Sequence, residues 1–383
     1  MRTPRLAVLV YSLLILCCGL ALSPPLEAAD PAAVQQVVAH YADIVHAGYQ
    51  DSHNRAIALQ GALQVLTDRP SAAALEAAKN AWKRARIPYG ETEAFRFYGG
   101  PIDDANGPEG QLNAWPLDES YIDYVQGNPG AGIINDPHAP ITQENLLALN
   151  EQGGEENVSL GYHAIEFLLW GQDLSTDGPG ARPVSDYVEA PRRAQYLHTV
   201  AAQLVGDLQS LVAAWAPGQN GNYRAAFLAQ EPNEALRQIM VGIGTLSRSE
   251  LAGERMAVAL ESRDQEDEHS CFSDNTHVDI IRNAQGIQNV VEGRYARSNG
   301  RVLAGPGILA LLQGERKAEL QQKTRNARAA VHAIQPPFDR EIVSAIGRQR
   351  VQAAIHALRS QAEAVVNAAA DLGISNLQVE LPE

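Results

Sequence analysis

Apolar residues return at helical spacing along most of this chain. In residues 31–68, valine, tyrosine and isoleucine side chains recur every three to four positions, which is the period of one face of an amphipathic helix. No run shows the alternation of apolar and polar residues that is typical of a half-buried strand. Similar apolar runs predict further helices over residues of about 71–87, 158–170, 192–216, 233–263, 275–292, 314–334 and 339–372. The pattern therefore predicts an all-α protein.

Glycine and proline separate these runs. Pro88 is expected to end the second helix, because proline lacks the backbone N–H that a helix interior needs. Residues 99–140 are rich in Gly, Pro, Asn and Asp and predict a long loop, which in a compact domain is usually functional or mobile. Residues 216–221 are the best candidate for a linker. The resulting prediction is two packed helical bundles, residues 30–216 and 217–383.

The N-terminal segment, residues 1–29, has the pattern of a secretory signal peptide. Arg2 and Arg5 precede an apolar run, which is followed by two prolines and small residues. A membrane anchor and a lipoprotein are the alternatives, but the run is shorter than the about 20 residues of a typical transmembrane helix. We therefore expect an exported protein, periplasmic or associated with the outer membrane. Removal of the segment leaves Cys271 as the only cysteine, so no intrachain disulfide can form.

The composition narrows the class of function. The chain has 383 residues, of which 30 are Lys or Arg and 45 are Asp or Glu, giving a formal charge of −15. This balance argues against nucleic acid as a partner, because nucleic-acid binding needs a basic surface. It favours cations weakly and without specificity. A hydrophobic content of 45% excludes disorder for the body of the chain.

The densest chemical signal lies in residues 161–173, Gly-Tyr-His-Ala-Ile-Glu-Phe-Leu-Leu-Trp-Gly-Gln-Asp. His163 and Glu166 are three residues apart, which places them on the same face of a helix. Their neighbours are apolar, and a carboxylate is costly to bury there without a partner. A metal ion is one possible partner, and an Arg or Lys from another helix is the other.

A second cluster occupies residues 264–277 and holds five carboxylates, two histidines and Cys271. Glu266 and His269 form an E-x-x-H step, and Asp274 and His277 form a D-x-x-H step. In di-iron carboxylate bundles, E-x-x-H steps combine with glutamates from other helices. The alternative is a solvated acidic turn in which a serine or Asp274 caps the next helix.

A third stretch, residues 82–97, places acids and arginines close to aromatic residues and Pro88. Glu93 is a possible carboxylate ligand for a metal, and Arg86 could pair with Glu93 or with a bound anion. Surface salt bridges are the alternative interpretation. The H-E-x-x-H helix of common zinc proteases, the G-x-S-x-G elbow and the P-loop are all missing from the sequence.

Two of these segments resemble one protein family. Gly161 to Glu166 fits the G-x-H-x-x-E motif of the imelysin family, and residues 167–173 also resemble that family. The block from Glu266 to His277 is similar to its iron-regulated, IrpA-like branch. The resemblance extends over about residues 30–375. It implies an exported, all-helical protein of two packed bundles, with a site near their interface built around the G-x-H-x-x-E helix.

The resemblance also implies a set of metal ligands. Tyr89 to Glu93 resembles the Y-x-x-x-E segment of the related domain in the Efe-type iron-uptake protein. This implies that Glu93 joins His163 and Glu166, with Asp103 as a further addition. The family is classed with metallopeptidases and named for an insulin-cleaving outer-membrane member, while other members are linked to iron uptake.

Three functions follow from these expectations. The first is iron binding in iron acquisition, because iron prefers hard oxygen ligands with some imidazole; other iron-uptake or outer-membrane components would then be partners. The second is a zinc peptidase, with His163 and Glu166 as ligands, a third from His269 or His277, and Glu93 or Glu166 as the catalytic carboxylate. The third is a metal-free periplasmic ligand-binding protein, in which Glu166 pairs with Arg86.

Overall fold

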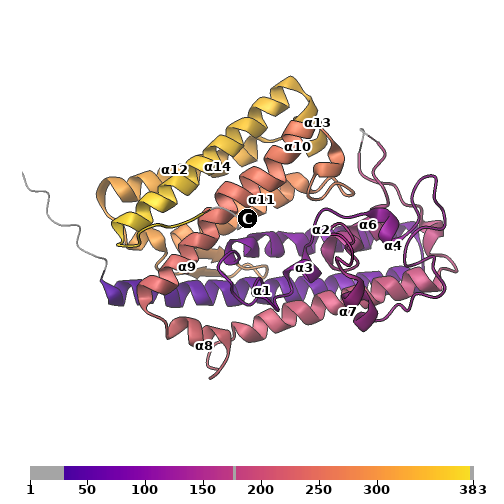
Figure 1. Cartoon of the computed structure of the whole chain (residues 1–383), viewed down its shortest axis with the longest axis horizontal. Coiled ribbons are helices and arrows are strands. Elements are labelled where there is room, and N and C mark those ends of the chain that lie inside the picture. The colour runs from indigo at the N-terminus through magenta and orange to yellow at the C-terminus, as the bar shows by residue number, and fades with distance from the viewer. Residues whose placement is uncertain (1–29, 176–177, 380–383) are drawn as a thin grey trace, which may run out of the picture.

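The structure, a computed structural model, describes residues 30–175 and 178–379 (Figure 1). The predicted signal peptide, residues 1–29, lies outside the described residues. Within the described ranges, no helix combines the length and the apolar character needed to cross a membrane.

Helices make up nearly all of the regular structure. The long helices are α1 (Pro31–Asp68), α2 (Ala72–Thr92), α7 (Pro191–Ala214), α9 (Pro232–Thr245), α11 (Thr276–Glu292), α12 (Gly314–Ala333) and α14 (Ala345–Asp371). The short ones are α3 (Glu109–Leu112), α4 (Glu119–Ile122), α5 (Gln143–Leu149), α6 (Gly161–Trp170), α8 (Tyr223–Leu228), α10 (Val258–Ser262) and α13 (Phe338–Val343). Single 3₁₀ turns are η1 (Glu93–Phe95), η2 (Val184–Tyr187), η4 (Gln265–Asp267) and η5 (Ile308–Ala310), and η3 (Leu246–Ala257) is a π-helix.

The helices gather in two groups that pack against each other (Figure 1). Helices α1, α2, α6 and α7 contact one another, and α14 packs on α9, η3 and α12 in the second group. Helix α11 joins the groups, since it packs on both α2 and α12, and α1 also contacts α9. Buried apolar side chains from both groups form one continuous core. The prediction of an all-α protein is confirmed, and the boundary at residue 217, in the turn before α8, stays a prediction.

The first two helices begin at side-chain caps. Asp30 accepts a hydrogen bond from the Ala32 N–H (3.1 Å), and Ser71 accepts one from the Ala74 N–H (3.1 Å). Such caps satisfy backbone donors that have no partner within the helix. Helix α1 has the bounds that the apolar period predicts, because its tyrosines, its leucines and all its valines except Val65 fall on the buried face.

The predicted end of the second helix at Pro88 is wrong, since α2 continues to Thr92. A proline inside a helix costs about 3 kcal/mol. Burial on both sides of the proline offsets this cost: Trp82 and Tyr89 are fully buried, and the Trp82 indole N–H donates to the Tyr162 carbonyl at 2.9 Å. Packing on α6 therefore outweighs the local preference.

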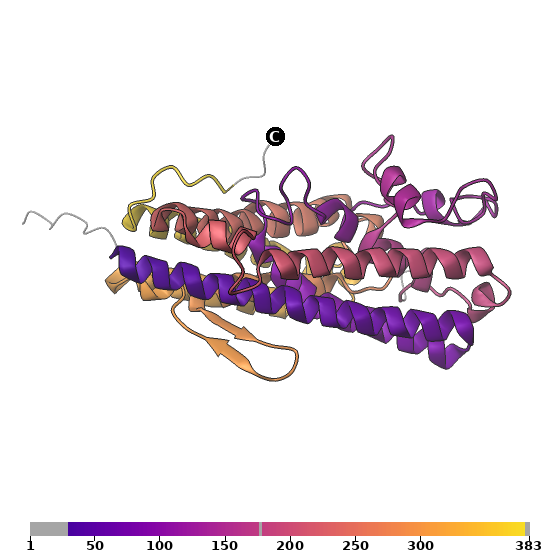
Figure 2. The same ribbon diagram turned by 90° about the horizontal axis from the view of Figure 1, so that it is seen from below.

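Several short elements were not predicted from the sequence, among them two one-turn helices and a hairpin. The loop expected over residues 99–140 contains the one-turn helices α3 and α4. A two-stranded antiparallel hairpin, β1 (Arg294–Ala296) and β2 (Val302–Ala304), pairs Tyr295 with Leu303. Figure 2 shows this hairpin extending alongside α1. Strands of three residues are too short to produce a recognisable alternation of apolar and polar residues.

Helices α2 and α11 approach each other closely at two glycines. A Cβ on Gly286 would lie 2.3 Å from the Glu91 carbonyl oxygen, and a Cβ on Gly90 would lie 2.9 Å from the Arg282 Cβ. Only glycine permits this separation of the two backbones. The close crossing brings polar residues of α2 and α11 into contact between the two groups of helices.

Candidate functional site

Helix α6 carries the G-x-H-x-x-E motif and is buried along its whole length. Gly161 has a φ of +84°, and a Cβ there would lie 2.6 Å from the Leu112 carbonyl oxygen. Both features require glycine. The first residue of the motif therefore brings the start of α6 against the end of α3, where the following residue, Asn113, reaches the site.

His163 and Glu166 contact each other on one face of α6. Nδ1 of His163 lies 2.9 Å from Oε2 of Glu166. Ser273 fixes the other carboxylate oxygen, since its N–H (3.0 Å) and its hydroxyl (2.6 Å) both donate to Oε1. Burial raises the pKa of Glu166 to about 8, although the Ser273 hydrogen bonds favour the anion. Burial, followed by the nearby His269 and Arg86, lowers the pKa of His163 well below its ordinary value.

The second ring nitrogen of His163, Nε2, is not used in the contact with Glu166. It is buried and has no hydrogen-bond partner among the described residues. Because the pKa of the ring is lowered, the imidazole is neutral at pH 7. When Glu166 is ionised, it accepts from the Nδ1–H of the neutral imidazole and leaves the Nε2 lone pair free, which is the arrangement of a metal-ligating histidine with its supporting acid. The raised pKa of Glu166 means that this form is favoured as the pH rises toward 8.

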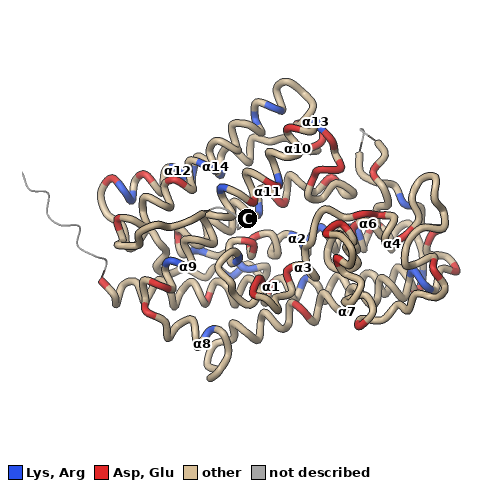
Figure 3. Tube along the Cα trace, viewed as in Figure 1, with Lys and Arg blue, Asp and Glu red and all other residues tan. Residues whose placement is uncertain are grey.

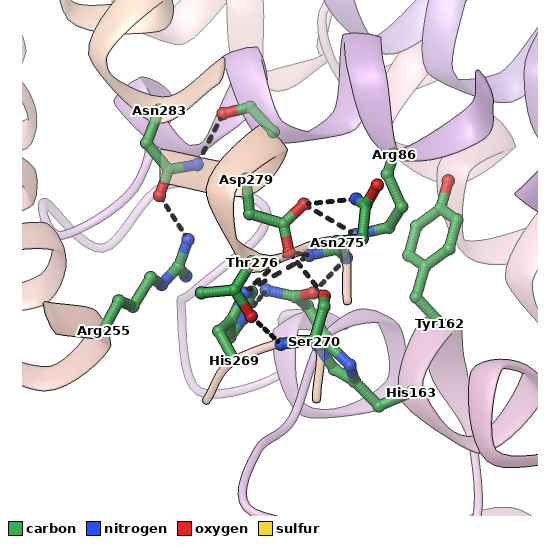
Figure 4. A network of polar contacts seen from close by, with 12 residues as sticks. Arg86, Tyr162, His163, Arg255, His269, Ser270, Asn275, Thr276, Asp279 and Asn283 are labelled. Carbon is green, nitrogen blue, oxygen red and sulfur yellow. Dashed lines mark hydrogen bonds and ion pairs between the residues drawn. The ribbon is translucent and has the colours of Figure 1, made fainter. Parts of the chain in front are cut away.

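Arg86 of α2 and Asp279 of α11 form a buried ion pair next to this histidine (Figure 4). The guanidinium donates from Nη2 to Oδ2 at 3.0 Å and from Nε to Oδ1 at 3.3 Å. Its Nη1 donates to the Asn113 side-chain oxygen at 2.5 Å. Burial by itself raises the pKa of Asp279, but the charges of Arg86 and the hydrogen bond from His269 outweigh it and hold that pKa far below its usual range. Asp279 is therefore ionised.

His269 lies between the ion pair and His163. Its Nδ1 is 3.1 Å from Oδ2 of Asp279, and its Nε2 is 3.4 Å from the Asn113 side-chain nitrogen. The His163 and His269 rings are 4.7 Å apart between centroids, and Trp115 is 5.4 Å from the His163 ring. Burial, then the charge of Arg255, lowers the pKa of His269 to about 4. The site thus contains two neutral imidazoles in contact.

A pocket of about 350 Å³ opens beside His269, which lines it together with Trp115. His163 is not part of the lining and contacts the pocket only through the His269 and Trp115 rings. Acidic side chains dominate the rest of its lining. The carboxylates are those of Glu109, Glu151, Glu155, Glu250, Glu254 and Asp267, and the cations are Arg96 and Arg255. The pocket therefore presents many hard oxygen donors before a neutral imidazole.

The π-helix η3 supplies one wall of this pocket. Arg255 donates from Nη2 to Glu93 (2.6 Å) and Glu250 (2.8 Å), and from Nη1 to the Asn283 side-chain oxygen (2.6 Å). Asn283 donates in turn to the Gly90 carbonyl at 2.9 Å. These contacts tie η3 to α2 and α11. Irregular helical turns of this kind are frequent at functional sites.

The structure brings four of the proposed site residues together. His163, Glu166, Arg86 and His269 form one buried network. Arg86 does not pair with Glu166 or Glu93, because Asp279 engages it.

Glu93 is placed apart from His163 and Glu166. Its carboxylate contacts Arg96 at 2.7 Å and Arg255 at 2.6 Å. Burial alone raises the pKa of Glu93, but the two guanidiniums outweigh it and lower the pKa to about 2. The contacts of Glu93 are thus with two arginines, and its role as a metal ligand stays a prediction.

Four other expected residues also lie away from the network. Asp103 accepts hydrogen bonds from the N–H groups of Phe97 and Gly100 and so shapes a turn. Glu266 is exposed, and Asp274 and His277 are half-buried. The E-x-x-H and D-x-x-H steps do not act as units, because residues 268–275 form a turn rather than a continuous helix.

The described ranges contain no group of three or more His, Cys, Asp or Glu side chains arranged to hold a metal ion. The guanidinium of Arg86 adds a fixed positive charge 3.5 Å from His269. The buried network therefore does not fit a resident metal cofactor, although Nε2 of His163 is a free donor atom.

Sequence reasoning missed Asp279, which is the central acid of the network. Asn275, the N-cap residue of α11, and Asp279 and Asn283 within the helix are spaced four residues apart and are all buried. This polar stripe on a buried helix face was the available signal, because buried polar groups need partners. The acidic lining of the pocket gave no signal, since its members come from separate segments.

Comparisons with known proteins fit this architecture. Residues 45–365 match the family model of imelysin. The iron-regulated protein A of Synechococcus elongatus is 29% identical over 304 residues, covering 76% of this chain and 73% of that protein.

Two solved structures share the fold. A protein described as an iron-regulated protein A precursor from Parabacteroides distasonis has a TM-score of 0.71 at 18% identity, covering 90% of this chain and 96% of that chain. An imelysin-like protein from Psychrobacter arcticum has a TM-score of 0.66 at 14% identity, covering 91% and 98%. The match to the family model spans both groups of helices and the buried histidines, so this chain belongs to the imelysin family.

Proposed function

We propose that this protein is exported and binds iron as cargo in iron acquisition, at the acidic pocket in front of His269 and His163. One observation carries the proposal: carboxylates line a pocket whose floor includes a neutral imidazole, and a second imidazole behind it has a free Nε2. Ferric iron prefers hard oxygen donors and accepts imidazole. The relative named iron-regulated protein A supports the link to iron.

The side chains have distinct roles in this proposal. The pocket carboxylates attract the iron by their charge, and side chains of the pocket move to contact it, because no three of them are arranged as a ligand set in the described ranges. Nε2 of His163, which has no partner among the described residues, is the nitrogen donor nearest to hand behind His269. Glu166 orients His163 through Nδ1 and is itself held by Ser273, so it acts as a positioning residue rather than a ligand. Arg86 and Asp279 fix His269 from behind. Release to other iron-uptake or outer-membrane components would follow export to the periplasm.

No observation favours a zinc peptidase to the same degree. A general base needs a pKa near the working pH, whereas Glu93 has a pKa of about 2 and is held by two arginines. Glu166 has its oxygens occupied by His163 and Ser273. A metal-free binder that uses Arg86 is disfavoured, because Asp279 and Asn113 already occupy the guanidinium.

Equilibrium titration of the exported protein with ferric nitrilotriacetate tests the proposal. His163→Ala and His269→Ala are expected to weaken iron binding at least tenfold with unchanged helicity. His163→Gln keeps a polar group beside Glu166, so weaker iron binding in this variant cannot be attributed to a folding defect caused by an empty space at residue 163. His356→Ala, an exposed histidine on α14, is the matched control. An iron titration of His163→Ala that matches the wild type would refute the site.

A further inference from the structure

A second pocket lies between α1, α2, α11, α12 and the hairpin, and it shares no residue with the acidic pocket. Its volume of about 570 Å³ falls within the range of small-molecule sites. Arginines dominate its lining: Arg55, Arg84, Arg282, Arg294, Arg297 and Arg328. The hairpin, which projects beside α1 in Figure 2, carries Arg294 on β1 and Arg297 directly after it.

Half of these arginines are engaged by the protein. Arg282 contacts Glu91 at 3.2 Å, and Arg297 contacts Asp51 at 2.9 Å. Arg328 donates to the neutral side chain of Gln288 at 2.8 Å.

The lining contains two carboxylates, Glu91 and Glu292. Glu292 accepts a hydrogen bond from Gln288 at 2.8 Å and pairs with no arginine among the described residues. Together with Asp51, which pairs with Arg297 from outside the lining, three carboxylates thus meet six guanidiniums.

The other three arginines have no carboxylate partner in the described part of the chain. They are Arg55 on α1, Arg84 on α2 and Arg294 on β1, so they converge from three separate elements. Like charges gathered in one cavity repel each other. This occurs in a chain with a formal charge of −15, so the concentration of positive charge is local rather than a result of composition.

We propose that this arginine pocket binds a compact anion that carries two or more carboxylate or phosphate groups. The guanidinium is planar and presents paired donors that match a carboxylate or a phosphate. A single negative charge would leave most of the excess positive charge uncompensated. The proposal is independent of iron binding at the acidic pocket.

The charge of the remaining surface favours a small ligand over a nucleic acid or another extended polyanion. Figure 3 shows Asp and Glu residues spread along the whole trace. An extended polyanion would also meet acidic residues outside the pocket and be repelled. A small anion would stay within a lining in which six arginines outnumber Glu91 and Glu292.

Calorimetric titration of the exported protein at low ionic strength, without metal, tests the inference. Citrate and pyrophosphate are the probes for the carboxylate and phosphate arms, and acetate is the singly charged control. Arg55→Ala, Arg84→Ala and Arg294→Ala are each expected to weaken binding about tenfold, as loss of a charge-assisted contact does. These substitutions leave no carboxylate of the pocket without its partner. Arg359→Ala, an exposed arginine on α14, should bind as the wild type does.

The outcomes separate the possibilities. Binding of citrate alone identifies a polycarboxylate, and binding of pyrophosphate alone identifies a phosphate ligand. His163→Ala should retain anion binding, so failure of the iron site does not affect this test. The inference is overturned if neither anion binds at millimolar concentration, if acetate binds as tightly as citrate, or if the three arginine variants bind like Arg359→Ala.

Discussion

At the scale of single residues, the site depends on a chain of hydrogen bonds that ends at one free atom. Ser273 holds Glu166, Glu166 holds Nδ1 of His163, and Nε2 of His163 is left without a partner. Groups of this supporting kind typically change metal affinity 10- to 100-fold when they are removed. Ser273 is therefore expected to matter for iron binding although it does not contact iron.

Ser273→Ala removes the hydroxyl that lies 2.6 Å from Oε1 of Glu166 and keeps the backbone N–H bond. We expect iron affinity to fall about tenfold with little change in the melting temperature. Ser249→Ala, at a serine whose hydroxyl contacts only the Val379 carbonyl, is the control in the same titration. Equal affinity in the two variants would contradict the positioning role of Ser273.

The low pKa of Glu93 predicts that the free energy of unfolding falls as the solution becomes acidic. The native pKa of Glu93, about 2, lies below the value in the unfolded chain, so the native state binds fewer protons than the unfolded state between these two pKa values. The stabilisation is present above about pH 4.5 and is lost as the pH falls to 2, by roughly 3 kcal/mol at 1.36 kcal/mol per pKa unit.

Urea unfolding between pH 5 and pH 2 measures this loss. Glu93→Gln is expected to be less stable at pH 7 and to show a shallower fall with acid than the wild type. Glu234→Gln removes a carboxylate from an exposed pair with Arg237 and should keep the wild-type slope, because such pairs contribute little. An unchanged slope in Glu93→Gln would show that the two arginines do not depress this pKa.

At the scale of elements, α6 owes its position to the glycine that begins its motif. Gly161→Ala is expected to destabilise the protein by about 2–4 kcal/mol, since the φ of +84° and the Leu112 carbonyl both oppose a Cβ. Gly206 is an exposed position of α7, where a Cβ would meet nothing within 4 Å, so Gly206→Ala should stabilise by about 0.5–1 kcal/mol. Thermal unfolding compares them, and destabilisation of equal size would contradict the explanation.

The elements also show how far the sequence predicts this structure. The apolar period places α1 at its observed bounds, and the three-residue spacing brings His163 and Glu166 into contact. It does not reveal that α2 passes through Pro88, because packing on α6 decides that. Nor does it identify Asp279 as the partner of Arg86, since these residues are separated by 193 positions and meet only through the α2–α11 crossing.

At the scale of the whole molecule, the two groups of helices share one core and are joined by buried ion pairs, Arg86–Asp279 and Arg255–Glu93. Arg86 belongs to the first group and Asp279 to α11. Breaking a buried pair by removing one partner costs about 3–5 kcal/mol, because the other charge is left without compensation. Because the Arg86–Asp279 pair contacts both groups, this loss of stability should lower the free energy of unfolding of the two groups together.

Asp279→Ala is therefore expected to lower stability by about 3–5 kcal/mol while unfolding remains a single transition. Far-ultraviolet circular dichroism and tryptophan fluorescence follow the helices and the buried Trp82 and Trp215, and their curves should coincide. Two separated transitions in the wild type would show that the groups of helices unfold independently and would contradict the shared core.

The most direct test of the iron proposal is a crystal of the exported protein soaked with ferric iron and measured at the iron absorption edge. We predict an anomalous peak in the acidic pocket, within about 2.0–2.6 Å of at least one carboxylate oxygen or imidazole nitrogen of the site, and none there in His163→Ala crystals. A peak confined to other acidic patches of the surface, or an unchanged peak in the variant, would contradict the account.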